Sequence, residues 1–229
     1  MTEISIIIPT LNESDNLPLL LADLSEVYEN AEILVIDSNS KDMTKEISII
    51  YGAKYFSIRK RNRGLQLNHG ARKAKGNWLL FLHADSRLKE NWSNEIKSVI
   101  KKNYKLIYFF KFKINNKRLI YRLLEFFVNC RSIFLKKPYG DQGLLINKKN
   151  FFKKNGYSEI PIMEDIDFIT RLQSKKNLIS LETSIFTSCR KWTNKSIIRQ
   201  SIRNWQYRRM WIKGESLEEI YKKYYEIKS

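Results

Sequence analysis

The chain lacks several residues and motifs that mark common kinds of site. Its two cysteines, Cys130 and Cys189, have no C-x-x-C spacing, so we expect free thiols in a reducing cytoplasm rather than disulfides. Its two histidines are too few for a histidine-based zinc site. The sequence has no G-x-S-x-G, no G-x-x-x-x-G-K-[ST] and no G-x-G-x-x-G. These absences disfavour an α/β-hydrolase, a P-loop protein and a dinucleotide-binding fold.

Long apolar runs are also absent. No stretch approaches the roughly 18 apolar residues that a transmembrane helix needs. The N-terminus has only a short apolar run without a basic start, so we expect no secretory signal. With 229 residues, 43% of them hydrophobic, the chain is long enough for one substantial core, and we expect a single domain.

The charge of the chain is strongly positive. Lys and Arg number 42 against 24 Asp and Glu, which gives a net charge of +18. Such a charge attracts phosphate, whether on nucleic acid, on anionic lipid or on a nucleotide-activated substrate. A lysine-rich surface without a specific partner explains it equally well. A non-catalytic nucleic-acid or anion-binding α/β protein is therefore our alternative, although no RNA- or DNA-binding motif is present.

Three short apolar segments end in polar, mostly acidic loops. Residues 4–8 precede Pro9, residues 32–36 precede Asp37, and the apolar run after Gly76 ends at Asp85. Such runs are typical of strands that are buried on both faces, and helical patterns separate them. We therefore predict an α/β fold with a mostly parallel sheet and flanking helices. Further strands are expected at residues 54–58, 106–114, 144–146 and 178–182, with an edge position considered for 106–114. Further helices are expected at residues 66–75, 90–102, 118–134, 166–176, 196–213 and 216–227.

The acids at these strand ends are the first candidates for a site, because ligands collect at the carboxyl ends of parallel strands. Asp85 could hold a divalent cation, since Mg²⁺ takes only one or two protein carboxylates when phosphates complete its shell. Asp37 could accept a hydrogen bond from a nucleobase N–H. Either residue could instead cap the helix that follows it.

Two other polar clusters have two interpretations each. The basic run at residues 59–64 suits contact with a diphosphate or is a solvated charge run. Glu164 and Asp165 precede a predicted helix, where they could supply a general base or simply favour the helix dipole. Arg190 and Trp192 could clamp a departing diphosphate or cover a surface.

Taken in order, these motifs resemble those of the family 2 glycosyltransferases, which have the GT-A fold with a Rossmann-like nucleotide-binding half. The resemblance spans most of residues 4–172. It is carried by the segments Ile6–Glu13, Val35–Thr44, Gly76–Asp85, Gly156-Tyr157 and Met163–Phe168. A narrower resemblance, to small bacterial transferases associated with radical-SAM and selenium domains, is carried by Arg63–Ala71, Gly140–Gly143 and Cys189–Trp192.

The resemblance implies a role for each matched residue. Asp37 would contact the base of a UDP- or GDP-linked sugar, and Asp85 would hold Mg²⁺ or Mn²⁺ against the diphosphate. Asp165, with Glu164 beside it, would take the proton of the acceptor hydroxyl. The other residues expected around the nucleotide sugar are Pro9, Thr10, Asn12, Glu13, Ser40, Arg63, Gln66, His83 and Ala84. Those expected around the acceptor or the diphosphate are Asp141, Gln142, Arg190 and Trp192.

One departure from the family pattern concerns the metal. The usual Asp-x-Asp motif is His83-Ala84-Asp85 here, so the first carboxylate is missing. Metal affinity would then be lower, or His83 would itself be a ligand or a hydrogen-bond partner. The implied reaction is a single displacement with inversion at the anomeric carbon.

We expect residues 1–86 to bind the nucleotide sugar, residues 87–195 to bind the acceptor, and residues 196–229 to form basic C-terminal helices. Helices 118–134 and 196–213 could lie on the inner face of an anionic membrane, which would suit a lipid-linked acceptor, or could pack against the sheet. No nucleic-acid partner is expected. A nucleotidyltransferase is the least favoured interpretation, because the first strand lacks the Gly-rich basic loop of such enzymes.

Overall fold

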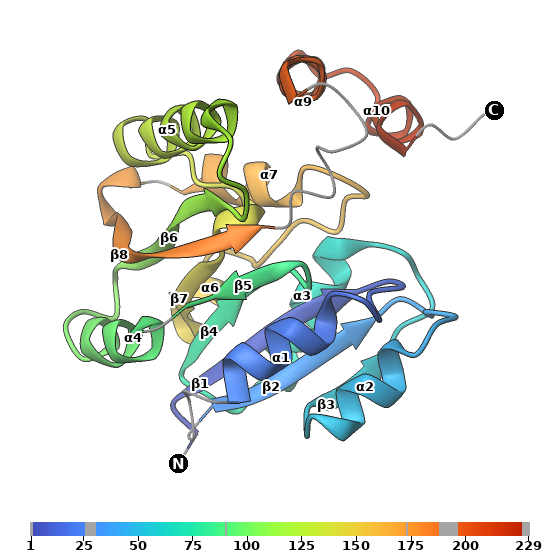
Figure 1. Cartoon of the computed structure of the whole chain (residues 1–229), viewed down its shortest axis with the longest axis vertical. Coiled ribbons are helices and arrows are strands. Elements are labelled where there is room, and N and C mark those ends of the chain that lie inside the picture. Colours follow the sequence, from blue (N-terminus) through green and yellow to red (C-terminus); the bar gives the residue numbers. More distant parts are fainter. Residues whose placement is uncertain (1, 26–30, 90, 173, 188–196, 226–229) are drawn as a thin grey trace.

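A computed structural model gives the structure of the chain. It describes residues 2–25, 31–89, 91–172, 174–187 and 197–225. The strands in these ranges form one eight-stranded sheet with the order β3-β2-β1-β4-β7-β6-β8-β5 (Figure 1). They are β1 (Ile4–Thr10), β2 (Ala31–Asp37), β3 (Lys54–Ser57), β4 (Trp78–Phe81), β5 (Ser86–Leu88), β6 (Ile107–Ile114), β7 (Leu144–Asn147) and β8 (Leu178–Thr187).

The sheet is parallel in its N-terminal half and mixed beyond it. Strands β3, β2, β1 and β4 all run in the same direction, and so do β6 and β8. Strand β7 is antiparallel to β4 and β6, and β5 is antiparallel to β8. The predicted α/β class, with a central sheet and flanking helices, is confirmed. The carboxyl ends of β1, β2 and β4 therefore lie at one edge of the sheet.

Helices cover both faces of this sheet. They are α1 (Leu17–Ser25), α2 (Thr44–Ile50), α3 (Arg63–Lys73), α4 (Trp92–Ile100), α5 (Leu119–Phe134), α6 (Lys148–Lys153), α7 (Glu164–Arg171), α9 (Ile197–Ile212) and α10 (Leu217–Tyr225). The 3₁₀ turns η1 (Gly140–Gln142) and η2 (Lys175–Asn177) complete the described elements.

Alternation along β1 shows why its apolar run is continuous. Ile4, Ile6 and Ile8 join one core with α1 and α4, whereas Ile7 joins a second core with α3, α6 and α7. Gly70 in α3 permits this packing, because a Cβ there would lie 2.5 Å from Cγ2 of Ile7. The strand is thus buried on both faces and is held in place beside the helix that begins at Arg63.

Several expected boundaries were wrong. Helix α3 begins at Arg63 rather than Gln66, because the Asn62 side chain caps it by accepting from the Leu65 amide at 2.9 Å. Helix α7 begins at Glu164 rather than Ile166 and ends at Arg171. The strand expected at 106–114, for which an edge position was considered, lies inside the sheet. The three-residue strand β5 was missed, since it is too short to show a period.

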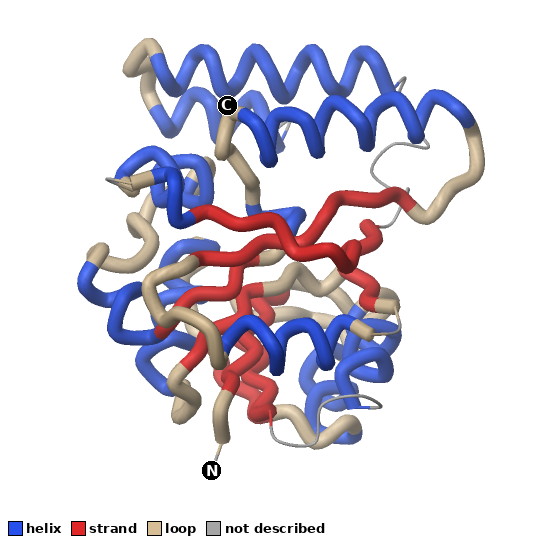
Figure 2. Tube along the Cα trace, turned by 90° about the vertical axis from the view of Figure 1, so that its left-hand side faces the viewer, coloured by secondary structure: helices blue, strands red, loops and turns tan. Residues whose placement is uncertain are grey.

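Helices α5, α9 and α10 lie together at one end of the molecule, beyond the strands (Figures 1 and 2). Their inner faces pack on the rest of the protein. Tyr121 of α5 joins a small core with Phe112 and Ile114 of β6. Among the described residues, no helix has the length and hydrophobicity that crossing a bilayer requires.

Candidate active site

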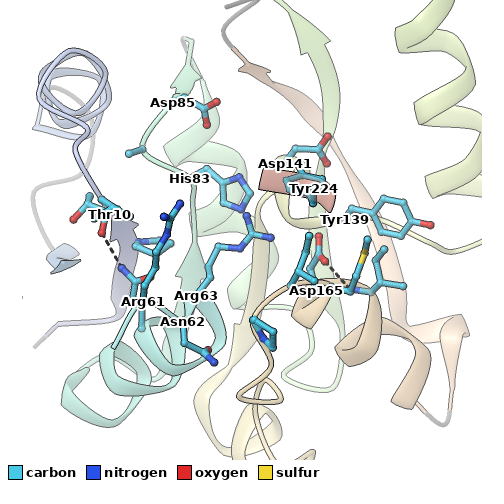
Figure 3. A pocket seen from close by; sticks show the side chains of 18 of the residues that line it. Thr10, Arg61, Asn62, Arg63, His83, Asp85, Tyr139, Asp141, Asp165 and Tyr224 are labelled. Atoms are coloured by element: carbon cyan, nitrogen blue, oxygen red, sulfur yellow. Dashed lines mark hydrogen bonds between the residues drawn. The ribbon is translucent and has the colours of Figure 1, made fainter. Parts of the chain in front are cut away.

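A cavity of about 450 Å³ lies at the edge of the sheet where β1 and β4 end. The structure brings ten of the residues that we predicted for the site into its walls: Pro9, Thr10, Glu13, Arg63, Gln66, His83, Ala84, Asp85, Asp141 and Asp165. They come from five separate parts of the sequence, namely the end of β1, the start of α3, the end of β4, the turn η1 and the first turn of α7. Figure 3 shows Arg61 and Arg63 between Thr10 on one side and Asp165 on the other.

Asp37 is close to this cavity without lining it. Its side chain is fully buried, and both carboxylate oxygens accept hydrogen bonds. Oδ1 accepts from the Thr10 and Ser40 hydroxyls at 2.9 and 2.5 Å, and Oδ2 accepts from the Ser40 amide at 2.7 Å and the Tyr55 hydroxyl at 3.0 Å. Burial and the nearby carboxylate raise the pKa of Tyr55 to about 12, so its hydroxyl remains a donor. Asp37 therefore joins the loops after β1 and β2, and its predicted contact with a base would require one of these donors to turn away.

Asn12 and Ser40 also lie outside the cavity wall. Asn12 has a left-handed backbone, with φ of 55°, and its amide donates to the Ser40 hydroxyl at 2.7 Å. The Lys41 amide donates to Asn12 Oδ1 at 2.9 Å. These bonds hold the loop after β1 against the loop after β2. In this structure both residues therefore support the cavity wall without lining the cavity.

Glu164 does not face the cavity either. Its side chain is 1% exposed, and its carboxylate forms an ion pair with the Arg63 guanidinium. Burial raises the pKa of Glu164, while the charge of Arg63 opposes that rise. Arg63 itself lines the cavity. The part of Glu164 in proton transfer stays a prediction, and in this geometry its carboxylate pairs with Arg63.

Asp165 and His83 meet at the backbone of Gly140. The Gly140 amide donates to Asp165 Oδ2 at 2.7 Å. A Cβ at Gly140 would lie 2.8 Å from His83 Nε2 and 3.2 Å from Asp165 Oδ2. The absence of a side chain at this position therefore lets His83, two residues after β4, and Asp165 in the first turn of α7 approach each other. Asp165 is oriented by a backbone donor and still lines the cavity.

Asp85 is the residue that we expected to hold a metal. It lines the cavity with His83, and the described residues contain no group of three His, Cys, Asp or Glu side chains that would form a metal cage. A cation here would therefore need most of its ligands from elsewhere. Mg²⁺ and related hard ions accept that arrangement when a substrate supplies phosphate oxygens. The residues present fit a cation that arrives with a diphosphate and do not fit a structural metal.

Gln142 is a buried support for the cavity wall. Its amide nitrogen donates to the Phe110 carbonyl at 3.1 Å, and its amide oxygen accepts from the Ser132 hydroxyl at 2.5 Å. Asp141, the neighbouring residue in η1, lines the cavity. The predicted contact of Gln142 with a ligand is replaced here by bonds that fix the turn. Arg190 and Trp192 lie outside the described residues.

The C-terminal helices supply lining residues that sequence reasoning missed. They are Asn204 and Arg208 from α9 and Tyr221 and Tyr224 from α10. Arg61, Asn62, Tyr139 and Thr187 also line the cavity, and of these only Arg61 and Asn62 lay in a segment that the sequence marked, the basic run at residues 59–64. Arg208 lies 5.4 Å from the centre of the Tyr139 ring, and Arg131 stacks on the same ring at 3.8 Å. The arrangement adds cationic and aromatic groups opposite the strand ends.

The same helices pack beside Asp165. Tyr207 of α9 and Ile220 of α10 form a core cluster with Ile162, Met163 and Ile166. Met163 precedes α7 with a left-handed backbone, at φ of 68°. The first turn of α7, which carries Asp165, is thus held from its outer side by the C-terminal helices. A pattern of apolar residues can show that a helix has a buried face, but it does not show what that face contacts.

Comparison with known proteins identifies the family. A model of the family described as Glycosyl transferase family 2 matches residues 5–160, more than half of the chain, so the chain belongs to this family. An uncharacterized glycosyltransferase of Haemophilus influenzae is 27% identical over 74% of this chain and 61% of its own length. The 4,4'-diaponeurosporenoate glycosyltransferase of Staphylococcus haemolyticus is 27% identical over 77% of this chain and 48% of its own length. The chain therefore spans less than two thirds of these relatives.

Solved structures agree on the fold. The S. aureus TarS structure has a TM-score of 0.68 and 17% identity, covering 81% of this chain and 36% of TarS. A GalNAc-T7 structure has a TM-score of 0.64 and 16% identity, covering 82% of this chain and 44% of its own. The predicted family 2 membership and GT-A fold are confirmed. The narrower radical-SAM and selenium-domain subgroup remains a prediction.

Proposed function

We propose that this protein transfers a sugar from a nucleoside-diphosphate sugar to an acceptor hydroxyl, with help from a divalent cation and with inversion at the anomeric carbon. One observation carries the proposal. Asp85 and Asp165, 80 positions apart in a 229-residue chain, line a single cavity together with Arg61 and Arg63. A cation site, a general base and cationic groups for a diphosphate are the parts that such a transfer requires.

The structural relatives support the choice of donor. Structures of TarS hold UDP and UDP-GlcNAc. GalNAc-T7 and the glucosyl-3-phosphoglycerate synthase of Mycobacterium tuberculosis hold UDP with Mn²⁺. A UDP-linked sugar with Mn²⁺ is therefore the first donor to try, followed by GDP-linked sugars and Mg²⁺. A lipid or lipid-linked hydroxyl remains our proposal for the acceptor.

Each side chain has a defined part in the proposed reaction. Asp165, oriented by the Gly140 amide, accepts the proton of the acceptor hydroxyl as that oxygen attacks the anomeric carbon. Arg63, held by Glu164, and Arg61 offer positive charge to the diphosphate as the bond to the sugar breaks. A cation at Asp85 would supply further electrostatic stabilisation of the leaving nucleoside diphosphate.

Calorimetric titration of UDP and GDP, with and without Mn²⁺, tests the donor site. We expect one nucleotide to bind more tightly with Mn²⁺, and Asp85→Ala to remove most of that gain because the cation loses its protein carboxylate. Asp23→Asn is the matched control, since Asp23 pairs with Arg87 outside the cavity. The same titration with a short oligonucleotide examines the alternative, a non-catalytic nucleic-acid or anion-binding protein. Tight, salt-sensitive oligonucleotide binding with no nucleotide binding would contradict the proposal.

A further inference from the structure

Helix α5 is apolar on two opposite faces. Tyr121, Leu124 and Val128 on the inner face pack on Phe112 and Ile114 of β6. On the other face, Leu119, Leu123, Phe126, Phe127 and Phe134 are between 52% and 83% exposed. Their spacing of i, i+4, i+7, i+8 and i+15 places them along one side of the helix. We call these five residues the α5 stripe.

The stripe belongs to a firmly attached helix. Glu125 accepts from the Ile114 amide at 2.6 Å, and Asn129 exchanges two hydrogen bonds of 2.8 and 3.0 Å with the Phe112 backbone. Ser132 donates to Gln142 at 2.5 Å. Polar groups therefore fix the inner face in one orientation, and the outward direction of the five apolar side chains follows from it. An exposed apolar patch on a well-anchored element marks a surface for an interaction.

The exposed charged residues in α5 and next to it in the sequence are of one sign. Lys117, Arg118, Arg122 and Lys137 are exposed beside or just beyond the helix. The only acid in α5 is Glu125, which is buried and paired with Arg122. Helix α9, at the same end of the molecule in Figures 1 and 2, contains no acid at all. Large apolar groups flanked by cations are the composition of a helix that lies in the interface of an anionic bilayer.

A second copy of the chain fits this face less well. Two α5 stripes in contact would bring the flanking lysines and arginines of one copy near those of the other. Each copy already carries a net charge of +18. A phospholipid surface instead offers phosphate to the cations and acyl chains to the apolar residues at the same time.

We propose that the α5 stripe docks this protein onto an anionic phospholipid surface. The five apolar side chains enter the boundary between headgroups and acyl chains, and Lys117 and Arg118 contact headgroup phosphates. This property goes beyond sugar transfer and requires no catalysis. The inner face of the same helix holds Gln142, whose neighbour Asp141 lines the cavity, so docking brings one wall of the cavity close to the bilayer.

Flotation with lipid vesicles tests this proposal. The whole protein is mixed with one of two kinds of vesicle. The first contains phosphatidylcholine alone, and the second also contains roughly 30% phosphatidylglycerol, which makes its surface clearly anionic. We expect the protein to float only with the anionic vesicles. Phe126→Ser/Phe127→Ser should weaken vesicle binding at least about 10-fold, because two aromatic rings no longer enter the bilayer. The matched control is Ile49→Ser/Ile50→Ser, which removes two exposed apolar side chains from α2.

The result depends on a comparison between the two variants, both of which should bind nucleotide as the wild type does. Loss of flotation with the α5 variant alone supports the proposal. Equal loss with the α2 variant would overturn it, because general surface hydrophobicity would then be responsible. A wild type that stays with the soluble fraction would also overturn it. If the wild type forms dimers and the Phe126→Ser/Phe127→Ser variant is monomeric, the α5 stripe binds a second copy of the chain instead of a membrane.

Discussion

The Arg63–Glu164 ion pair joins a lining residue of the cavity to a buried carboxylate, and the two partners are unequally exposed. The Glu164 side chain is 1% exposed and that of Arg63 is 37% exposed. Removal of one partner from a fully buried pair costs about 3–5 kcal/mol, whereas exposed pairs contribute at most about 1 kcal/mol. Arg63→Met leaves a buried carboxylate without its cation, so we expect it to lower the free energy of unfolding by about 2–3 kcal/mol at pH 8.

Glu164→Gln should be the milder change. It keeps the shape of the side chain and an oxygen that can still accept from Arg63, and it leaves that arginine in contact with water. We expect a loss of about 1 kcal/mol, the size of an ordinary hydrogen bond. Combined with Arg63→Met, it should recover part of the stability that Arg63→Met alone removes, because no buried charge then remains.

The effect of Arg63→Met should depend on pH in a defined direction. Burial already raises the pKa of Glu164 above its ordinary value of 4.5, and removal of Arg63 takes away the charge that opposes the rise. A carboxyl group with a raised pKa in the folded state destabilises the protein progressively as pH increases above the unfolded value. The loss in Arg63→Met should therefore be small near pH 4.5 and larger at pH 8.

Urea denaturation at several pH values measures these differences. The wild type, both single variants and the double variant are compared, with Lys111→Met as a control, because its acidic partner Glu182 is 87% exposed. Arg63→Met with unchanged stability at pH 8, or with a loss that does not vary between pH 5 and 8, would refute the reasoning.

Other predictions concern the cavity and its supports. Gly140→Ala, whose methyl group would lie 2.8 Å from His83 Nε2, should lower kcat at least about 10-fold with little change in Tm, and an unchanged kcat would count against the site. Asn68→Ala should lower the free energy of unfolding in urea by about 2 kcal/mol, because Asn68 exchanges hydrogen bonds of 2.7 and 3.0 Å with the Tyr157 backbone; a neutral result would contradict this. Arg208→Ala should raise the KM of the donor or the acceptor in steady-state kinetics with little change in Tm. Unchanged kinetics would remove α9 from the site.

The sequence was most informative where one residue pattern has one structural meaning. The runs that became β1, β2 and β4 are mostly apolar because both faces of those strands are covered. Since parallel strands end at a common edge, the meeting of Thr10 with His83 and Asp85 in one cavity followed from the strand prediction.

The sequence was less informative about which way polar groups turn. Asp37 stands at a strand end like Asp85, but Thr10, Ser40 and Tyr55 surround its carboxylate. Ser40 belongs to the same loop as Asp37, but Thr10 and Tyr55 come from β1 and β3, and nothing in the local pattern specifies that they converge on Asp37. Glu164 and Asp165 are neighbours in the sequence, yet the helical turn directs one toward Arg63 and leaves the other in the cavity wall.

The C-terminal helices illustrate a third kind of difficulty. Helix α9 has aromatic and basic residues on several sides, so its pattern suits a membrane surface and a packed helix equally well. In the structure Tyr207 is buried, Arg208 lines the cavity, and Trp205 is half exposed. Only the long-range packing of α9 and α10 on residues 162–166 decides which side chains reach the site.

Turnover by a matched pair of variants tests the central claim most directly. Asp165 lines the cavity, whereas Asp167, on the same first turn of α7, bonds Ser158 and Arg171 outside it. With a UDP- or GDP-linked sugar and Mn²⁺, we expect Asp165→Asn to reduce nucleoside-diphosphate release at least about 100-fold, and Asp167→Asn to retain near-normal release. Near-normal release by Asp165→Asn would contradict the assignment of this cavity as the place of sugar transfer.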